Sequence, residues 1–365
     1  MAPFGRFFLP GPTEVRPAIR RAMTKPMIGH RGAVFQELFA RLQEGLRYVF
    51  RTSRPVYIST SSATGLMEAG VRCAPPGRML ALVNGAFSQR FATIAGLTGR
   101  DFDVYEVAAG HAHDVDELAR RLDLNRYAVV TVVHCETSTG AVNDVRAIAQ
   151  AARERGVATV VDSVTGIGGI PFEFDEWGID FALTGSQKAL ALPPGLAFAA
   201  ATPAFIAGAR SAPGRGVYFD LAEYESATAK NETPNTPAVS LLFALDEQLK
   251  AIRAEGLQAR WARHAAMQDR MERWVEAVRH ATARDLRIAV PKESRSATVT
   301  TVQLPGGVSG SALVGAVARR GFTIGTGYRA LGDNSFRVGH MGDHTVRGLG
   351  RCLAACEDAL SELLH

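Results

Sequence analysis

Residues 127–162 read YAVVTVVHCETSTGAVNDVRAIAQAARERGVATVVD, and this stretch decides the fold. It begins and ends with apolar runs rich in β-branched residues, Tyr127–His134 and Val157–Asp162, neither of which alternates polar and apolar positions. Such runs are typical of strands that are buried on both faces of a sheet. A helical segment, Val145–Arg155, lies between them. The stretch therefore predicts two parallel strands joined by a helix.

The same alternation extends outward in both directions. Further strands are expected at 56–59, 79–83, 102–107, 181–184 and 196–201. Helices are expected at 33–50, 64–72, 88–97 and 115–122, the first of them from apolar residues at helical spacing. Strands that alternate with helices predict a mostly parallel sheet covered on both faces.

From about Pro237 the pattern changes. Two long helices are predicted at 237–254 and 257–280, then strands at 298–304 and 336–340, with a helix that opens at Ser309 between them and a terminal helix at 344–364. This part predicts a smaller α+β domain. We therefore expect an N-terminal arm at 1–15, a large domain at 16–245 and a small C-terminal domain at 246–365.

The composition of the 365 residues excludes several functions. The net charge is only +5 and the basic residues are dispersed, so we expect no nucleic-acid partner. The uncharged stretch 189–209 is interrupted by prolines and a glycine, which predicts a loop and a buried strand instead of a membrane span. The N-terminus has no secretory pattern, and the four cysteines lack metal-binding spacing. A cytoplasmic protein without a metal or a membrane anchor is expected.

Lys188 ends the segment Thr184-Gly185-Ser186-Gln187-Lys188, which follows a short predicted strand. A lysine in this position is usually a surface residue. The neighbours of Lys188, however, are small, apolar and uncharged. A desolvated lysine has a lowered pKa and is a better nucleophile toward an aldehyde, so the segment indicates a Schiff-base lysine.

Asp162 ends a buried strand, at the edge of the sheet where open α/β folds bind ligands. A turn or helix-capping aspartate is the ordinary alternative. The distance along the chain to Lys188 allows one connection and one neighbouring strand, which brings both side chains to the same edge. A lysine beside a carboxylate that can hold a protonated pyridine nitrogen is the pairing that pyridoxal phosphate requires.

The segment Ser59–Gly65 (STSSATG) lies between a predicted strand and a predicted helix. Small hydroxyl residues at a helix N-terminus offer free backbone N–H groups and the positive end of the helix dipole, which suits a phosphate. Because serine and threonine caps are common, this pattern by itself does not specify a phosphate site.

An ordered set of motifs resembles the class V, fold-type-I, pyridoxal-phosphate aminotransferases, in particular their alanine/serine–glyoxylate (serine–pyruvate) branch. The motifs are Leu9–Thr13 (LPGPT), Gly29-His30, Ser61–Gly65 before Met67–Ala69, Asn84–Arg90 (NGAFSQR), Glu136–Gly140 (ETSTG), Asp162–Val164 (DSV), Gly185–Lys188 (GSQK), Thr233–Pro237 (TPNTP) and Phe336–Gly339 (FRVG). They cover almost the whole chain. The resemblance implies a large α/β domain with a mostly parallel, seven-stranded sheet covered by helices, a smaller α+β C-terminal domain, and a homodimer with shared active sites.

The resemblance also implies roles toward the cofactor, pyridoxal 5'-phosphate. Lys188 would carry it as a Schiff base and shuttle the proton, and Asp162 would pair with its ring nitrogen. The other expected cofactor contacts are Ser62, Ala63 and Thr64 around the phosphate, Phe87 stacked on the ring, Thr137 near the ring hydroxyl, Val164, Gln187 near the phosphate, and Thr236 on the phosphate of the other subunit. Arg337 would bind the substrate α-carboxylate through a bidentate fork.

In three places the chain departs from the family pattern. The family often has Trp where this chain has Phe87, and Gly where it has Ala63. Stacking on Phe87 covers less area, and a contact through the backbone N–H of Ala63 tolerates the methyl group. The family often has an aromatic residue at Thr233, which is therefore not expected to bind the cofactor.

The implied reaction is a ping-pong transamination from alanine or serine to glyoxylate or pyruvate. The alternative is an aspartate-type or aminophosphonate aminotransferase of the same family. The position of Arg31 distinguishes such a donor from a small one. Arg31 is either a solvated residue before the helix that starts near Ala33, or it faces the substrate and pairs with the distal acid of such a donor.

Several other patterns in the sequence lack residues that their functions would require. Gly166–Pro171 (GIGGIP) has proline at the third glycine position of a dinucleotide loop, which leaves a nicotinamide-dependent oxidoreductase only as a distant alternative. His111 and His113 lack a third metal ligand. Cysteine desulfurases share the fold but usually carry histidine where this chain has Gln187. A catalytically inactive scaffold is the remaining alternative.

Overall fold

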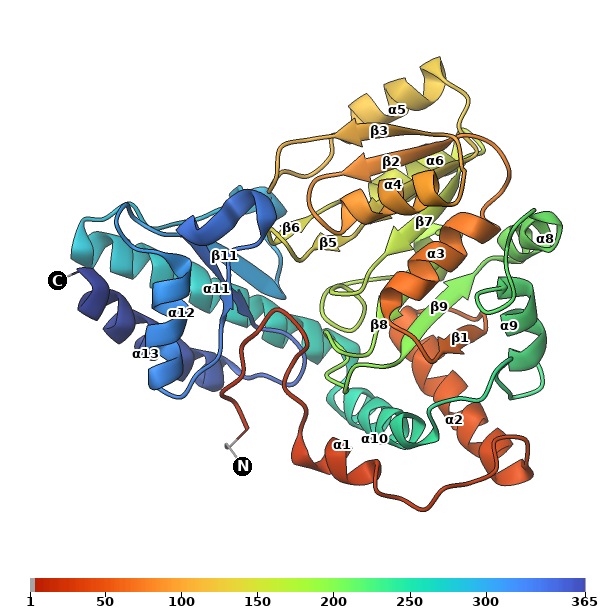
Figure 1. Cartoon of the computed structure of the whole chain (residues 1–365), viewed down its shortest axis with the longest axis horizontal. Helices are drawn as coiled ribbons and strands as arrows, with labels where there is room; N and C mark the ends of the chain where they lie inside the picture. Colours follow the sequence, from red (N-terminus) through yellow and green to blue (C-terminus); the bar gives the residue numbers. More distant parts are fainter. Residues whose placement is uncertain (1–3, 365) are drawn as a thin grey trace.

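The computed structural model describes residues 4–364, which form a large sheet-based part and a smaller C-terminal part (Figure 1). Seven strands of the large part lie in the order β1-β9-β8-β7-β4-β2-β3. Their bounds are β1 Val56–Ser59, β2 Met79–Val83, β3 Phe102–Glu106, β4 Val129–Val133, β7 Ala158–Asp162, β8 Phe181–Gly185 and β9 Ala197–Ala201. In this sheet only β9 runs antiparallel to its neighbours, β1 and β8. The prediction of a mostly parallel, seven-stranded sheet is therefore confirmed.

Alternate residues of each strand pack into two separate cores, one on each face of the sheet. In β2, for example, Leu80 and Leu82 join one core, and Met79 and Ala81 join the other. The first core is covered by α2 (Ala33–Phe50), α5 (Val115–Leu124), α6 (Val145–Arg153) and α10 (Val239–Glu255). The second is covered by α3 (Ala63–Cys73), α4 (Ser88–Leu97), α8 (Pro203–Ser211) and α9 (Leu221–Thr228). Burial on both faces explains why the strands read as continuous apolar runs.

The C-terminal part is built on an antiparallel sheet with the strand order β10-β11-β13-β12. Its elements are α11 Leu257–Thr282, β10 Arg287–Ile288, β11 Val299–Gln303, α12 Gly310–Arg319, β12 Gly325–Thr326, β13 Ser335–Gly339 and α13 Val346–Leu364. A separate core that includes Val302 and Phe336 holds them together. The expected boundary between residues 245 and 246 falls inside α10, which is one continuous helix.

The pattern of the sequence did not reveal the shorter elements. They are α1 Pro17–Ala22, the β5–β6 hairpin (Cys135–Glu136 and Ala141–Val142), α7 Phe174–Trp177, α9, β10, β12, and the 3-10 turns η1 Lys292–Ser294 and η2 Arg329–Asn334. The stretch 189–209 forms a loop and β9, as predicted, but it also starts α8 at Pro203, where the Thr202 hydroxyl caps the helix. No helix within residues 4–364 is long and apolar enough to cross a membrane.

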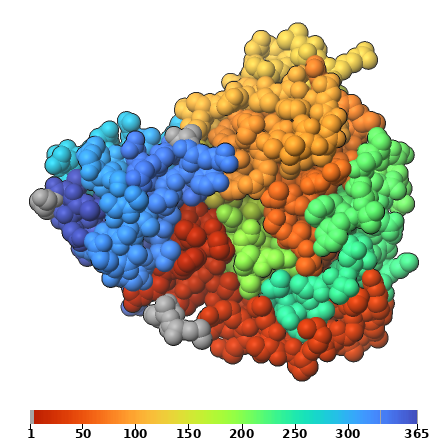
Figure 2. Space-filling model, viewed as in Figure 1, coloured from red at the N-terminus to blue at the C-terminus, as the bar shows by residue number. Residues whose placement is uncertain are grey.

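The N-terminal arm connects the two parts of the molecule. The Phe8 N–H donates to Thr323 O (2.7 Å), and Phe8 O accepts from the Gly339 N–H (2.8 Å). Further along, the Thr13 N–H donates to Gln187 O (2.9 Å). Figure 2 shows this red segment at the surface between the blue C-terminal part and the large domain. The arm therefore lies directly beside the loop that carries Lys188.

Candidate active site

Asp162 and Lys188 line one cavity at the carboxyl edge of the sheet. Asp162 is the last residue of β7, and Lys188 follows β8, which pairs with β7 in parallel. The cavity has about 430 Å³ of empty space, part of which is open to solvent. The predicted residues that line it, besides these two, are Ser62, Ala63, Thr64, Phe87, Thr137, Val164 and Gln187. Residues chosen from separate motifs thus meet at one place, as expected for the edge where parallel strands end.

Burial changes the acid–base behaviour of both central groups. Desolvation, and secondly the charge of Arg337, lowers the pKa of Lys188 to about 8. Desolvation raises the pKa of Asp162 to about 6, although its carboxylate accepts a hydrogen bond from the Val164 N–H (2.9 Å). At neutral pH the site therefore holds a carboxylate and a lysine that loses its proton far more readily than an exposed lysine does.

The carbonyl of Pro10, in the N-terminal arm, accepts a hydrogen bond from the Lys188 ammonium. The arm comes so close here that a Cβ on Gly11 would collide with the Lys188 side chain. Gly11 also has a φ of +118°, which side chains disfavour. The LPGPT motif therefore forms one wall of the lysine site.

The N-terminus of α3 forms the hydroxyl-rich end of the cavity. Ser62 is its N-cap residue but makes no side-chain capping bond. Ala63 and Thr64 are the first two helical residues, whose N–H groups have no partner within a helix. Free N–H groups, hydroxyls and the positive dipole end suit a phosphate. The residues present therefore fit a phosphorylated cofactor.

Phe87 is held by residues that the motif analysis did not assign. The buried Glu136 carboxylate accepts from the backbone N–H groups of Phe87 (3.1 Å) and Ser88 (2.9 Å) at the start of α4. The Tyr328 ring stacks on Phe87, with 6.1 Å between centroids and 9° between planes. Lys188 Nζ lies 5.9 Å from the Phe87 centroid. Phe87 is thus a fixed aromatic wall beside the lysine.

Arg337, on β13 of the small domain, is not among the residues that line the cavity, but it contacts Thr137, which does line it. It donates to Thr137 O and Thr326 O, both at 3.0 Å. Its guanidinium carbon lies 5.1 Å from the centroid of Tyr328. Partial burial lowers the pKa of Arg337 from its usual value. A cation beside cavity-lining Thr137 suits the carboxylate of a bound substrate.

The structure does not bring Arg31 or Thr236 to the cavity of their own chain. The Arg31 guanidinium donates to the Glu232 carboxylate (2.9 Å), Thr233 O (2.8 Å) and Pro234 O (3.3 Å). Thr236 lies in the same loop, and it is exposed. The expectation that Arg31 faces the substrate therefore finds no support within one chain, because its donors are taken up by the loop that carries Thr236.

Five further residues line the cavity that were not predicted from the sequence as site residues. They are Met67, Arg90, Val133, Cys135 and Thr165. Arg90 is part of the NGAFSQR motif, so its position was available from the sequence although its role was not. Thr165 shares a hydrogen bond of 2.6 Å with the Thr137 hydroxyl. Met67 was part of a quoted motif without an assigned role, Val133 lies in a predicted strand, and Cys135 donates to the Ser296 hydroxyl (2.9 Å).

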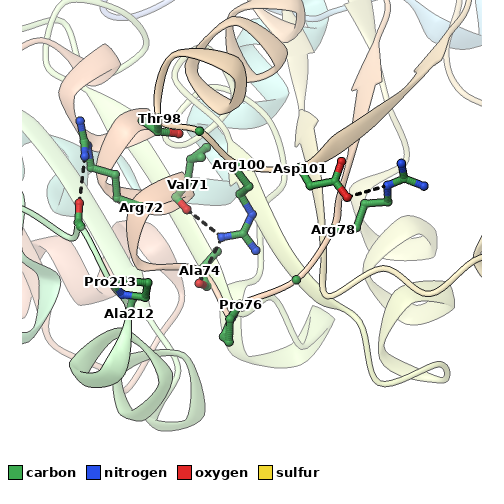
Figure 3. A pocket seen from close by; sticks show the side chains of 13 residues that line it. Val71, Arg72, Ala74, Pro76, Arg78, Thr98, Arg100, Asp101, Ala212 and Pro213 are labelled. Atoms are coloured by element: carbon green, nitrogen blue, oxygen red, sulfur yellow. Dashed lines mark hydrogen bonds and ion pairs between the residues drawn. The ribbon is translucent and has the colours of Figure 1, made fainter.

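A second, larger cavity of about 910 Å³ lies at the opposite edge of the sheet, near the starts of β2 and β3 (Figure 3). Its arginines are held by the chain itself. Arg100 donates to Val71 O (3.2 Å) and Ala74 O (3.3 Å), and Arg72 donates to Gly214 O (2.8 Å). Arg78 pairs with Asp101 at 3.2 Å. These contacts tie loops together, and none of the predicted site residues lies here. Within residues 4–364, no group of three or more His, Cys, Asp or Glu is placed to hold a metal ion.

Residues 25–347 match the family model of the class-V aminotransferases, and the chain belongs to this family. It is 34% identical to the soluble hydrogenase 42 kDa subunit of Anabaena cylindrica over 98% of this chain and 93% of that protein. It is 32% identical to L-aspartate–glyoxylate aminotransferase of Paracoccus denitrificans over 98% and 91%. The solved structure of alanine–glyoxylate aminotransferase from Nostoc sp. has a TM-score of 0.90 at 30% identity, covering 99% of this chain and 96% of that one.

The comparisons confirm the family, the fold class and the enzyme class that the sequence predicted. The protein is an aminotransferase, and the family implies pyridoxal phosphate as the cofactor and amino and oxo acids as substrates.

Proposed function

We propose that this enzyme transfers an amino group from a small L-amino acid, alanine or serine, to glyoxylate or pyruvate, with pyridoxal 5'-phosphate bound at Lys188. The observation that carries the proposal is that Lys188 and Asp162 face one cavity, with the free N-terminus of α3 at one end. Glyoxylate appears in the names of the alanine–glyoxylate aminotransferase structure and of the L-aspartate–glyoxylate aminotransferase relative.

The chain supplies the acid–base groups that the reaction needs. When bound, the cofactor supplies an electron sink for the negative charge that forms at the substrate α-carbon. Asp162, a carboxylate at neutral pH, would hold a proton on the ring nitrogen. Lys188, with its pKa of about 8, can take a proton and return it near neutral pH. In the cofactor-free chain the Pro10 carbonyl accepts a hydrogen bond from the Lys188 amine.

Substrate orientation falls to Arg337 and the aromatic wall. The Arg337 guanidinium is fixed by two backbone carbonyls, so it can bind a carboxylate without first being ordered. Tyr328 lies between Arg337 and Phe87 and fills space beside the carboxylate site. This wall supports a donor with a short side chain.

An aspartate donor is the second candidate. It is favoured by the similarity to the L-aspartate–glyoxylate enzyme, and it needs a second cation for the distal carboxylate. Arg31 could serve only in the site of another subunit, and only if it leaves Glu232. We regard the small donor as the better supported of the two.

A homodimer with shared sites is part of the proposal. Thr236 is exposed in its own chain, and its loop is fixed by Arg31 at the surface. The cavity at Lys188 has no residue from this loop. A threonine held in this way is available to the phosphate end of the cavity in a second copy.

The test is a spectrum followed by a panel of donors. The purified protein should be yellow, with a visible band that borohydride bleaches. Alanine and serine should shift this band in a single half-reaction, aspartate much less, and glyoxylate or pyruvate should restore it. A colourless protein that binds NADH would instead support the oxidoreductase alternative, and a yellow protein inert to every donor would support an inactive scaffold.

A further inference from the structure

Arg90 lines the cavity and has no role in the function proposed above. It lies in the first turn of α4, three residues after Phe87. A cation is unfavourable there, because the N-terminal end of a helix dipole is positive. Within residues 4–364, no carboxylate forms an ion pair with Arg90. The stability of α4 therefore does not explain why an arginine occupies this position.

Two contacts define where the Arg90 side chain lies. Nη1 donates to Thr64 Oγ1 at 2.8 Å, and the guanidinium carbon lies 5.0 Å from the Phe87 ring centroid. Side chains on a helix point toward its N-terminus, which carries the guanidinium back over Phe87. Arg90 thus joins the aromatic wall to the hydroxyl-rich end of the cavity.

The contact with Thr64 has a direction. Arginine can only donate, so Thr64 Oγ1 must accept. The Thr64 hydroxyl proton is then left to donate to another group. Thr64 is also the second residue of α3, whose N–H lacks a helical partner. One residue can therefore offer two donors to a phosphate. Beside it lies the Arg90 guanidinium, whose charge favours the ionised form of Asp162 but which forms no ion pair with a carboxylate of residues 4–364.

We propose that Arg90 is a positioning residue for the cofactor phosphate, which it serves by orienting the Thr64 hydroxyl and by balancing negative charge at the N-terminus of α3. This inference rests on the proposed function, since it needs a phosphorylated cofactor at Lys188. If Arg90 acts in this way, it contributes to the binding of the cofactor phosphate in particular. If it only supported the Phe87 ring, its contribution would not depend on the phosphate.

The test compares pyridoxal phosphate with pyridoxal, which lacks the phosphate. The full chain without cofactor is titrated with each, for the wild type and Arg90→Gln. We expect Arg90→Gln to weaken pyridoxal phosphate binding by about 10- to 100-fold. Pyridoxal should weaken by no more than about fivefold, from loss of the Phe87 contact. Arg90→Lys should recover part of the selectivity for the phosphate.

Two further variants serve as a control and as a test of the contact between Arg90 and Thr64. Arg121 also lies over an aromatic ring, 4.4 Å from the Tyr105 centroid, but far from the cavity, so Arg121→Gln should bind both ligands normally. Thr64→Val should weaken pyridoxal phosphate, and adding it to Arg90→Gln should cost less than the two separate losses combined. If Arg90→Gln folds poorly, the same double-mutant cycle can be measured with Arg90→Lys in its place.

The outcomes separate this inference from the function itself. An equal loss for both ligands, or no loss, overturns the role of Arg90 while the wild type still binds the cofactor. Failure of the wild type to bind pyridoxal phosphate overturns the proposed function and this inference with it.

Discussion

The guanidinium of Arg31 and the carboxylate of Glu232 form an ion pair of 2.9 Å that joins the segment before α2 to the loop carrying Thr236. The same guanidinium also holds two carbonyls of that loop, Thr233 O and Pro234 O. Arg31 therefore fixes a loop in this chain. The sequence offered a different possibility, in which it bound the distal acid of a substrate.

Replacing Arg31 by Ala should affect all donors alike. Without its three contacts the loop of Thr236 loses its position, so cofactor affinity and activity should fall together, by about tenfold, the value of one charge-assisted hydrogen bond. The measurement is kcat/KM on alanine, serine and aspartate. Glu232→Gln should show the same uniform pattern. A selective loss of aspartate activity would restore the dicarboxylate hypothesis.

Thr236 can be tested by mixing an inactive Lys188→Ala variant with a weakened Thr236→Ala variant. If Thr236 acts on the neighbouring subunit, a dimer of one Lys188→Ala chain and one Thr236→Ala chain contains one intact site. Reassociation of the two variants should therefore give more activity than the average of the two variants measured separately. If Thr236 acts within its own chain, every site keeps one defect and mixing recovers nothing. Self-mixed samples of each variant are the controls.

Lys188→Ala should abolish turnover and the borohydride-sensitive band. No other lysine among the described residues lines the cavity. The loss should exceed 1,000-fold, roughly the scale seen when an essential catalytic group is removed. Lys250→Ala, which removes a surface lysine paired with Asp246, is a suitable control. Substantial transamination by the Lys188 variant would refute the assignment.

Asp162→Asn should retain some cofactor but lose most of its activity. A neutral amide cannot stabilise a protonated ring nitrogen, so the electron sink weakens while the shape of the cavity is kept. The expected signature is a large fall in kcat with a much smaller change in cofactor affinity. Near-normal kcat would remove Asp162 from the reaction.

Lys188→Met should stabilise the cofactor-free protein at neutral pH. The folded-state pKa of Lys188 is about 8, below its ordinary 10.5, so the folded chain binds fewer protons than the unfolded chain between these values. Stability then rises with pH across this window, and the cost of burying the charge is complete only below pH 8. The gain from Lys188→Met should be larger at pH 7 than at pH 10.5 by about 3 kcal/mol, from 1.36 kcal/mol per pKa unit. The difference that remains at pH 10.5 reflects the exchange of a neutral amine for a thioether, which does not depend on pH.

Denaturant unfolding of both proteins from pH 7 to 10.5 measures this difference. All other titrating groups are common to the two chains, so their contributions cancel. A gain that stays constant with pH would show that Lys188 is not desolvated in the folded protein.

The sequence by itself determined the central sheet and most of the cavity. Runs such as Tyr127–His134 are apolar at every position because both faces of the sheet are covered, and that requirement is visible in the sequence. Asp162 and Lys188 could be paired in advance because parallel strands end at a common edge. Ser62, Phe87 and Gln187 lie in contiguous motifs, so each was carried to the cavity by its own strand or helix.

Only the tertiary structure decided the contacts between distant segments. Four examples are Glu136 with the backbone of Phe87, the Pro10 carbonyl with Lys188, Arg90 with Thr64, and Arg31 with Glu232. Each of these contacts depends on how separate elements dock. The sequence around a residue looks the same whether its side chain faces a substrate, a loop or solvent. Periodicity records which face of an element is buried, whereas the identity of the group across a cavity is fixed by packing alone.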